Sequence, residues 1–468
     1  MSREAGASPT PPHEYAACEP VPPGARTIGF GHMLAIWTGA NANNGTWYVG
    51  GVVAGAAFGG AALATLTANP LAYLVMALVG LIGFRTGVST MALTRPALGL
   101  SGSMLPSLLN VVQLVGWNAV NTFIAAISVT YILHYWVGTP PFGSPGDTGP
   151  LLIGLGLMAL LNMLSILYGH RSVKVMECLG TVAILALGLW ETVLVLREVP
   201  LAAIWSWSPP GGQVMPVGRA VDAMAAFSLG WAPVIADFTR YCRTRGAATL
   251  APILGANLGL FWFAFVGIIC TIAAAVTTGV YDPNLSDPSS TAARLGLGGL
   301  AFVIILLASV TTNAINIMGA GISMTNCLPR LRAMPALWIT ALLSVALSLV
   351  PLFLASFLDS FILFLDAIGM LFGPLFGILL ADYFLLRRPY LAAELTNPDG
   401  PYRYQRGVRR SAVLAWALAV GGFLVFKQIP AMTDGPGCIF PALALAALLH
   451  ILLARPGRNA QSPALKSE

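Results

Sequence analysis

Polar and aromatic side chains share one face of an apolar stretch at residues 105–136. Asn110, Gln113, Trp117 and Asn121 follow one another at spacings of three, four and four, which places them on one side of a helix. The indole of Trp117 offers a large flat ring and an N–H donor, and the amide of Asn121 both donates and accepts hydrogen bonds. The pair suits a flat heterocycle that bears amide groups. The alternative is a tryptophan packed in a helix bundle, with asparagines that join neighbouring helices.

A second group of oxygen-bearing side chains lies in the apolar stretch 296–327. One helical face carries Ser309, Thr312, Asn313 and Asn316, with Ala308 and Thr311 beside it. Hydroxyl and carbonyl oxygens without formal charge suit a weakly held monovalent cation, whereas a calcium site would require several carboxylates. A structural role stays open, because serine and threonine in helices often bond back to their own i−4 carbonyl.

Two apolar stretches contain residues that interrupt a helix. In 28–57 they are Gly39, Asn41, Asn43, Asn44 and Gly45; in 217–240 they are Gly230 and Pro233, which flank Trp231. Broken backbone at membrane depth is tolerated only where it faces protein or a water-filled cavity. Both stretches are therefore candidates for a binding site. The alternatives are asparagines that join helices in the first stretch and a packing kink in the second.

The elements that must position these residues are membrane helices. Of 468 residues, 57% are hydrophobic and 9% are charged, and the mean hydropathy is +0.78. A soluble domain carries about a quarter charged residues, so the sequence predicts an all-α, polytopic membrane protein with apolar spans of about 20 residues. Twelve spans are predicted, at 28–57, 62–84, 105–136, 150–168, 174–196, 217–240, 248–279, 296–327, 334–354, 357–385, 409–428 and 436–454.

The interrupted spans are the first and the sixth. Because they are five spans apart, a second copy of a five-helix unit would enter the membrane in the opposite sense. Paired interrupted segments indicate inverted repeats with a binding site between them at mid-membrane. The predicted units are a disordered cytoplasmic tail at 1–26, a first repeat at 27–200, a second at 201–386, two further spans at 387–454 and a cytoplasmic tail at 455–468.

Basic residues predict the orientation. If the N-terminus is inside the cell, 20 of the 24 Lys and Arg residues fall in the segments between spans that face the cytoplasm. The other four are Arg197, Arg219, Arg294 and Lys427. The positive-inside rule then places both termini in the cytoplasm of a cell membrane protein. The basic residues are dispersed, so no nucleic-acid partner is expected. The sequence holds no HExxH, Walker A or paired catalytic acid motif, and we expect no enzyme activity and no cofactor.

Several motifs resemble one family. The stretch 83–117, GFRTGVSTMALTRPALGLSGSMLPSLLNVVQLVGW, is similar to the cytosine/purine permeases, the nucleobase:cation symporters. IWTGAN in the first span, DFTRY in the sixth and VTTN in the eighth extend the resemblance to residues 25–450. The resemblance implies twelve helices, of which ten form two inverted five-helix repeats of the LeuT type. It also implies cation-driven uptake of a nucleobase-like ring, as in cytosine, hydroxymethylpyrimidine, hydantoin and allantoin transporters.

The resemblance also assigns site residues. It implies that Trp117 and Trp231 sandwich the ring and that Asn121 bonds to it. It further implies a sodium site made by the Ala308 carbonyl and the Thr311 and Thr312 hydroxyls, completed by backbone carbonyls of the first span at Ala40 and Asn43. One departure concerns a ligand-binding asparagine of the eighth span, whose position holds Ile317 here, so that Asn313 or Asn316 would have to substitute.

The sequence is therefore interpreted as a cation-coupled importer of a planar heterocycle. Candidate substrate-binding residues are Asn41, Asn44, Gln113, Trp117, Asn121, Gly230, Trp231, Asn313 and Asn316. Sodium is the expected coupling ion, and a proton carried by Glu191, Asp222 or Asp366 is the alternative. We expect a monomer in the lipid bilayer. A symporter of the same fold for another small metabolite such as an amino acid, or a non-transporting receptor, stays open.

Overall fold

The computed structural model describes residues 18–328, 330–353 and 357–454; side-chain positions are described except at 168–181 and 333. Within these ranges the chain is helical and forms no sheet. The longer helices are α1 (Phe30–Asn41), α2 (Asn44–Val53), α3 (Ala57–Thr86), α5 (Met104–Val137), α6 (Thr148–Glu198), α8 (Val217–Leu229), α11 (Leu250–Thr278), α13 (Gly299–Cys327), α14 (Ala333–Ser348), α15 (Phe357–Leu380), α16 (Arg410–Phe426) and α18 (Ile439–Leu453). The short ones are α4 (Thr94–Leu98), α7 (Leu201–Ser206), α9 (Ile235–Thr239), α10 (Arg245–Ala248), α12 (Pro288–Arg294) and α17 (Pro430–Thr433).

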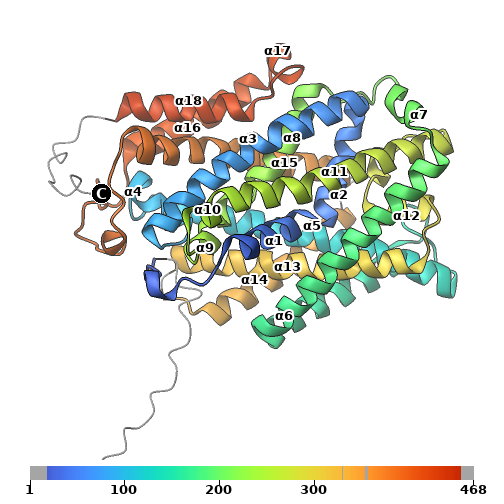
Figure 1. Cartoon of the computed structure of the whole chain (residues 1–468), viewed down its shortest axis with the longest axis horizontal. Coiled ribbons are helices and arrows are strands. Elements are labelled where there is room, and N and C mark those ends of the chain that lie inside the picture. The colour runs from blue at the N-terminus through green and yellow to red at the C-terminus, as the bar shows by residue number, and fades with distance from the viewer. Residues whose placement is uncertain (1–17, 329, 354–356, 455–468) are drawn as a thin grey trace, which may run out of the picture.

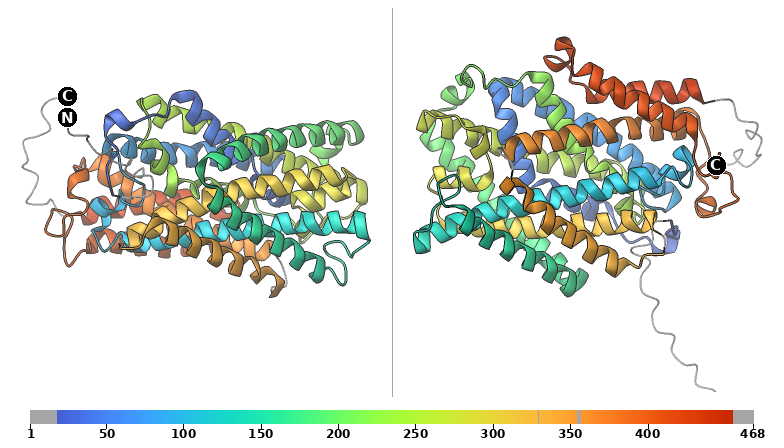
Figure 2. Two further views of the ribbon diagram at one scale, coloured as in Figure 1. Left: turned by 90° about the horizontal axis from the view of Figure 1, so that it is seen from below. Right: turned by 180° about the vertical axis from the view of Figure 1, so that it is seen from behind.

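Helices cover all twelve predicted spans. Among the described residues, eight helical segments are long and apolar enough to cross a membrane, and the apolar helices α16 and α18 are shorter. The long helices run side by side along one axis of the molecule, with α16 and α18 at one edge and α6 and α14 at the other (Figures 1 and 2). The structure thus has the polytopic all-α architecture that the sequence predicts.

One predicted loop is absent. The fourth and fifth predicted spans both fall within α6, and the backbone is helical through the loop expected at 169–173. That loop, GHRSV, contains no proline, and histidine and arginine are compatible with a helix. The two ends of α6 have different partners: Gly154 lies against Ala126 in α5, and Gly188 lies against Phe263 in α11.

The interrupted spans pack in a reciprocal manner. The first span, α1 and α2, packs on α11, while the sixth span, α8 and α9, packs on α3. The third and eighth spans, α5 and α13, pack on each other, and α6 contacts both. If each of the first five spans is matched with the span five places later, the first pair of contacts becomes the second. A fold of two five-helix repeats requires this correspondence. The predicted boundary between the repeats, at residues 200 and 201, falls between α6 and α7.

Part of the predicted N-terminal tail is folded against the helices. The backbone N–H of Val21 donates to the Gly87 carbonyl at 2.9 Å, and that of Ile28 donates to the Tyr241 carbonyl at 2.9 Å. A 3-10 turn, η1 (Pro23–Ala25), lies between these contacts. Ordered structure therefore begins before residue 27. Residues 1–17 and 455–468 of the two predicted tails lie outside the described residues.

Candidate functional site

The first break is capped by its own asparagine. Helix α1 ends at Asn41, and Asn43 has an extended backbone that begins α2. The Oδ1 of Asn43 accepts from the Thr46 N–H at 2.9 Å, and its Nδ2 donates to the Ala40 carbonyl at 2.5 Å. Asparagine is among the best N-cap residues because its side-chain oxygen accepts a free N–H of the first turn. The Ala40 carbonyl, a predicted cation ligand, is thus bonded to the Asn43 amide.

The second break is held by other helices. Helix α8 ends at Leu229, and a 3-10 turn, η3 (Ala232–Val234), leads into α9. The Gly230 carbonyl accepts from Nε2 of Gln113 in α5 at 2.9 Å. The N–H of Ala236 donates to the Thr90 hydroxyl at 2.8 Å. These bonds satisfy backbone groups that a continuous helix would have paired.

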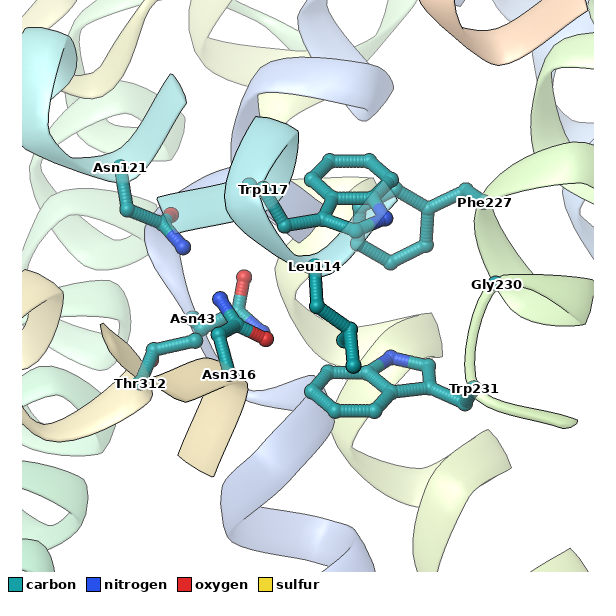
Figure 3. Close-up of a pocket in the computed structure, with 10 residues that line it drawn as sticks. Asn43, Leu114, Trp117, Asn121, Phe227, Gly230, Trp231, Thr312 and Asn316 are labelled. Atoms are coloured by element: carbon teal, nitrogen blue, oxygen red, sulfur yellow. The ribbon is translucent and has the colours of Figure 1, made fainter. Parts of the chain in front are cut away.

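The two breaks meet α5 and α13 around a small cavity. Its lining consists of Asn43, Gly45, Leu114, Trp117, Asn121, Phe227, Gly230, Trp231, Thr312 and Asn316 (Figure 3). The volume that the centre of a water molecule can reach is about 20 Å³, which is room for about one water. In Figure 3 the Leu114 side chain lies between the indoles of Trp117 and Trp231. A ring can therefore enter only if Leu114 and its neighbours move.

Two amides in the cavity have no hydrogen-bond partner among the described residues. Asn121 and Asn316 are each 2% exposed, and Nδ2 of Asn316 is fully buried without a partner. An unpaired buried amide costs roughly 1–3 kcal/mol. The cavity thus keeps unsatisfied donors and acceptors, and none of its lining residues is charged. Such a site suits a neutral ligand that carries both donors and acceptors.

Aromatic side chains form the two walls of the cavity. The Trp117 ring meets Phe227 edge to face, with centroids 5.1 Å apart and an interplanar angle of 79°. The Trp231 ring meets Trp37 at 5.8 Å and 88°. A β-carbon at Gly230 would lie 3.3 Å from Nε1 of Trp117, so the second break closely approaches that indole. These T-shaped contacts hold the two indoles on opposite sides of the cavity, with Leu114 between them.

The predicted cation ligands of α13 lie together. The Thr311 and Thr312 hydroxyls donate to the Ala308 carbonyl at 2.9 Å and 3.0 Å. This is the back-bonding that the sequence left as an alternative, and each hydroxyl oxygen still has lone pairs. Thr312 and Asn43 both line the cavity, so α13 and the first break meet there.

Four predicted substrate residues do not line the cavity. Gln113 bonds to the second break. Asn41 accepts from the Tyr73 hydroxyl at 2.5 Å, and Asn44 donates to the Ile305 carbonyl at 2.7 Å. Asn313 donates to the side chains of Thr122 in α5 and Asn162 in α6. Ile317, at the position where the resemblance expects an asparagine, packs with Leu337 and Ala341, and Asn316 lies in the cavity instead.

Sequence reasoning missed three residues of the lining: Gly45, Leu114 and Phe227. Helical periodicity could have found Leu114, which lies three residues before Trp117 on the same helix and therefore shares its face. Phe227 lies near the end of α8 and Trp231 lies in the break beyond it, so periodicity does not relate these two side chains.

The predicted proton carriers lie outside the cavity. Asp222 accepts from the backbone N–H groups of Cys438 and Ile439, both within 2.9 Å. Asp366 pairs with Lys427. Glu191 is fully buried, and its two carboxyl oxygens have no partner in the described part of the chain.

A bundle with two broken helices around a neutral, aromatic mid-molecule cavity defines a membrane transporter, and comparisons with known proteins specify its family. Residues 20–441 match the family described as permease for cytosine/purines, uracil, thiamine, allantoin, and the chain belongs to this family. It is a permease and not an enzyme. The predicted family and fold class are confirmed.

The matches with known relatives cover most of both chains. The allantoin permease of Bacillus subtilis is 26% identical over 86% of this chain and 84% of its own. The cytosine permease of Escherichia coli K12 is 26% identical over 86% of this chain and 87% of its own. The structure is similar to that of Mhp1, a nucleobase-cation-symport-1 family transporter, in a closed conformation with bromovinylhydantoin bound. The TM-score is 0.74 at 20% identity, over 93% of this chain and 94% of the other.

Proposed function

We propose that this permease uses a sodium gradient to import a neutral planar heterocycle with amide groups. The observation that carries the proposal is the cavity between the Trp117 and Trp231 indoles, which holds two unpaired amides and no charged side chain. Stacking would bind the faces of the ring, and Asn121 and Asn316 would bond to its edge. Cytosine, purines, hydroxymethylpyrimidine, allantoin and hydantoin all have this chemistry.

The relatives support this class of substrate. Two of them are named for allantoin and cytosine, and Mhp1 was solved with bromovinylhydantoin bound. An amino acid would need a partner for its carboxylate, such as an arginine or free helix N-terminal N–H groups. No arginine lines the cavity, and Asn43 caps the N-terminus of α2. A neutral ring therefore fits the cavity better than an amino acid.

Sodium is proposed to bind between the first break and α13. The Ala308 carbonyl with the Thr311 and Thr312 hydroxyls supplies one side of such a site, and Ala40 and Asn43 supply the other. A sodium ion would compete for the Ala40 carbonyl, which Asn43 now occupies. Cation binding would then release the Asn43 amide towards the cavity, where the ring binds.

Transport is proposed to occur by alternating access, with both termini in the cytoplasm. The helices α1, α2, α3, α8, α9 and α11 would rock as one body against α5, α6, α13 and α14. Two observations support this division. The interrupted spans pack tightly on α11 and α3. Between these helices and the group of α5 and α13 lies the cavity, so the packing is less complete there. The monomer contains every group that the mechanism uses.

The test is intrinsic tryptophan fluorescence of the purified protein, titrated with cytosine, hypoxanthine, hydroxymethylpyrimidine, allantoin and hydantoin in sodium or potassium buffer. We expect one ring to quench saturably and to bind more tightly in sodium. Uptake of that ring into proteoliposomes should require an inward sodium gradient. If a pH gradient alone drives uptake, sodium coupling is wrong and Glu191 becomes the first carboxyl to replace. If none of the rings binds or is transported, the proposed substrate class is wrong.

The variant Trp117→Ala should lose substrate binding while it stays folded. Base–aromatic stacking contributes ~1–3 kcal/mol per ring, so the dissociation constant should rise roughly 5- to 150-fold. The matched control is Trp136→Ala on the same helix, because Trp136 is 78% exposed and lies away from the cavity. Unchanged affinity in Trp117→Ala, measured by uptake of labelled ring, would contradict the stacking arrangement.

A further inference from the structure

Behind the cavity, four uncharged polar side chains from three helices bond to one another. They are Asn118 and Thr122 of α5, Asn162 of α6 and Asn313 of α13, and each is at most 2% exposed. We call them the amide network. None of the four lines the cavity.

The bonds of the network converge on Thr122 and Asn162. The Thr122 hydroxyl accepts from Nδ2 of Asn313 at 3.0 Å and from Nδ2 of Asn162 at 3.2 Å, and it donates to Oδ1 of Asn118 at 3.4 Å. Nδ2 of Asn313 also reaches Oδ1 of Asn162 at 3.2 Å. Nδ2 of Asn118 donates to the Asn313 carbonyl at 3.3 Å, so the network also fixes the backbone of α13.

Three members of the network are chain neighbours of cavity residues. Asn118 follows Trp117, Thr122 follows Asn121, and Asn313 follows Thr312. Adjacent residues on a rigid helix keep a fixed angular relation. A shift of α5 against α13 at the network would therefore displace the indole, the amide and the hydroxyl on the cavity side by a similar distance.

Asn162 is the member that joins these two helices from outside. It comes from α6, and its amide bonds to both α5 and α13. Apolar packing alone tolerates sliding between helices, whereas a buried, hydrogen-bonded network favours one register. An apolar side chain at this position would remove the bonds that tie both helices to α6, and it would leave α5 and α13 joined only by the Asn313–Thr122 and Asn118–Asn313 bonds of the network.

We propose that Asn162 is a positioning residue for substrate recognition. It holds α5 and α13 in one register. In this register Trp117 and Asn121 of α5 lie opposite Thr312 and Asn316 of α13, so that both helices contribute to the same binding site. This inference rests on the proposed function of the cavity. It assigns a role in affinity to a side chain that touches neither ligand nor cation.

The experiment replaces Asn162 with leucine, whose side chain has the same branched shape and number of heavy atoms, in the full-length purified protein. The readouts are the fluorescence dissociation constant for the ring that quenches the wild type, in sodium and in potassium, and the thermal unfolding midpoint. We expect Asn162→Leu to bind the ring roughly tenfold more weakly in sodium, with a smaller gain from sodium than the wild type shows. The matched control is Ser165→Ala one turn further along α6, where the hydroxyl donates only to the Asn162 carbonyl, and it should bind normally.

A second variant keeps the test decisive if Asn162→Leu fails to fold. Thr122→Val preserves shape and removes the hydroxyl on which three bonds of the network meet, so it should also weaken binding. Where both variants fold, the double variant should bind no more weakly than the weaker of the two, because both disrupt one network.

The inference is overturned if either folded variant binds with the wild-type constant, or if the two effects on the dissociation constant simply multiply. These results differ from a failure of the proposed function. If the wild type binds none of the rings, the proposed function is wrong and the inference falls with it. If the wild type binds and the variants bind equally well, only the role of Asn162 is wrong.

Discussion

The two broken helices differ in how they rest on their partners. The first lies on α11 backbone to backbone: a β-carbon at Gly259 would be 2.3 Å from the Thr38 carbonyl oxygen, and one at Gly267 would be 2.1 Å from that of Trp47. The second lies on α3 through side chains. There a β-carbon at Gly83 would be 2.3 Å from the Ala236 methyl group.

The breaks also differ in how their free backbone groups are satisfied. The first uses a residue of its own, Asn43, for both Thr46 and Ala40. The second depends on Gln113 and Thr90 from elsewhere in the chain. If a cation binds at the Ala40 carbonyl, as proposed, it would replace a bond within the first break and leave other helices undisturbed, whereas a change at the second break must involve α5. Under the proposed sodium coupling, the comparison predicts that the first break senses the cation and that the second supports Trp231.

The largest predicted effect tests the backbone contact of the first break. Gly259→Val places a branched side chain against the Thr38 carbonyl and the Ala42 N–H, and neither group can move unless α1 moves. Overpacking a close contact costs about 1–3 kcal/mol, and a backbone obstacle puts this substitution at the upper end. We expect a strong loss of folded protein in membranes and a lower unfolding midpoint.

Gly421→Val in α16 is the control, because a β-carbon at Gly421 meets no atom within 4 Å. Normal yield and normal stability of Gly259→Val would show that α1 and α11 are not held at this distance.

An intermediate loss of stability is predicted at the second break, and a second substitution there should restore it. Gly83→Ala brings two methyl groups together at Ala236 and should destabilise the protein by about 1–2 kcal/mol. Because the closest obstacle is the Ala236 methyl group and the backbone Cα of Ala236 lies further away, at 3.0 Å, Ala236→Gly in the same chain should restore much of the unfolding midpoint. Absence of rescue in Gly83→Ala/Ala236→Gly would mean that the second break, like the first, is limited by backbone.

Much of the architecture could be predicted from the sequence. Apolar stretches of membrane length identify helices directly, and glycine, proline and clustered asparagines identify both breaks. The loop expected at 169–173 was the exception, because charged and polar residues mark a membrane boundary in composition without forcing the backbone out of a helix. The pattern of apolar residues therefore predicts the length of each membrane span better than it predicts the residue at which a helix ends.

The site could be predicted where helical periodicity applies. Trp117 and Asn121 lie on a regular helix, and spacing alone places them on one face. Periodicity fails inside a break: Ala42 has a ψ of 72°, so the chain turns out of the helical register there. The sequence could not tell which of Asn41, Asn43 and Asn44 faces the cavity. Packing decides this, and only Asn43 lines the cavity.

The choice among the polar residues of α13 also depended on packing. Asn313 and Asn316 lie one turn apart and have the same chemistry. Partners on α5 and α6 take up the Nδ2 group of Asn313, whereas Asn316 has none in the described part of the chain and lines the cavity. Sequence spacing gives the face of a helix but not the neighbours that occupy it.

The smallest predicted effect on stability separates the two tasks of Asn43. Asn43→Ala removes the cap of α2 and the bond to the Ala40 carbonyl, and loss of an N-cap costs about 1 kcal/mol. Asn43→Ser keeps a side-chain oxygen that can accept from the Thr46 N–H, so its unfolding midpoint should stay near that of the wild type. Both variants lose the amide that bonds to Ala40, and both should show an altered sodium dependence of ring binding. If serine is as destabilising as alanine, capping is not what Asn43 contributes. If sodium dependence is unchanged in both, the first break does not sense the cation, and the contrast between the two breaks would be one of packing alone.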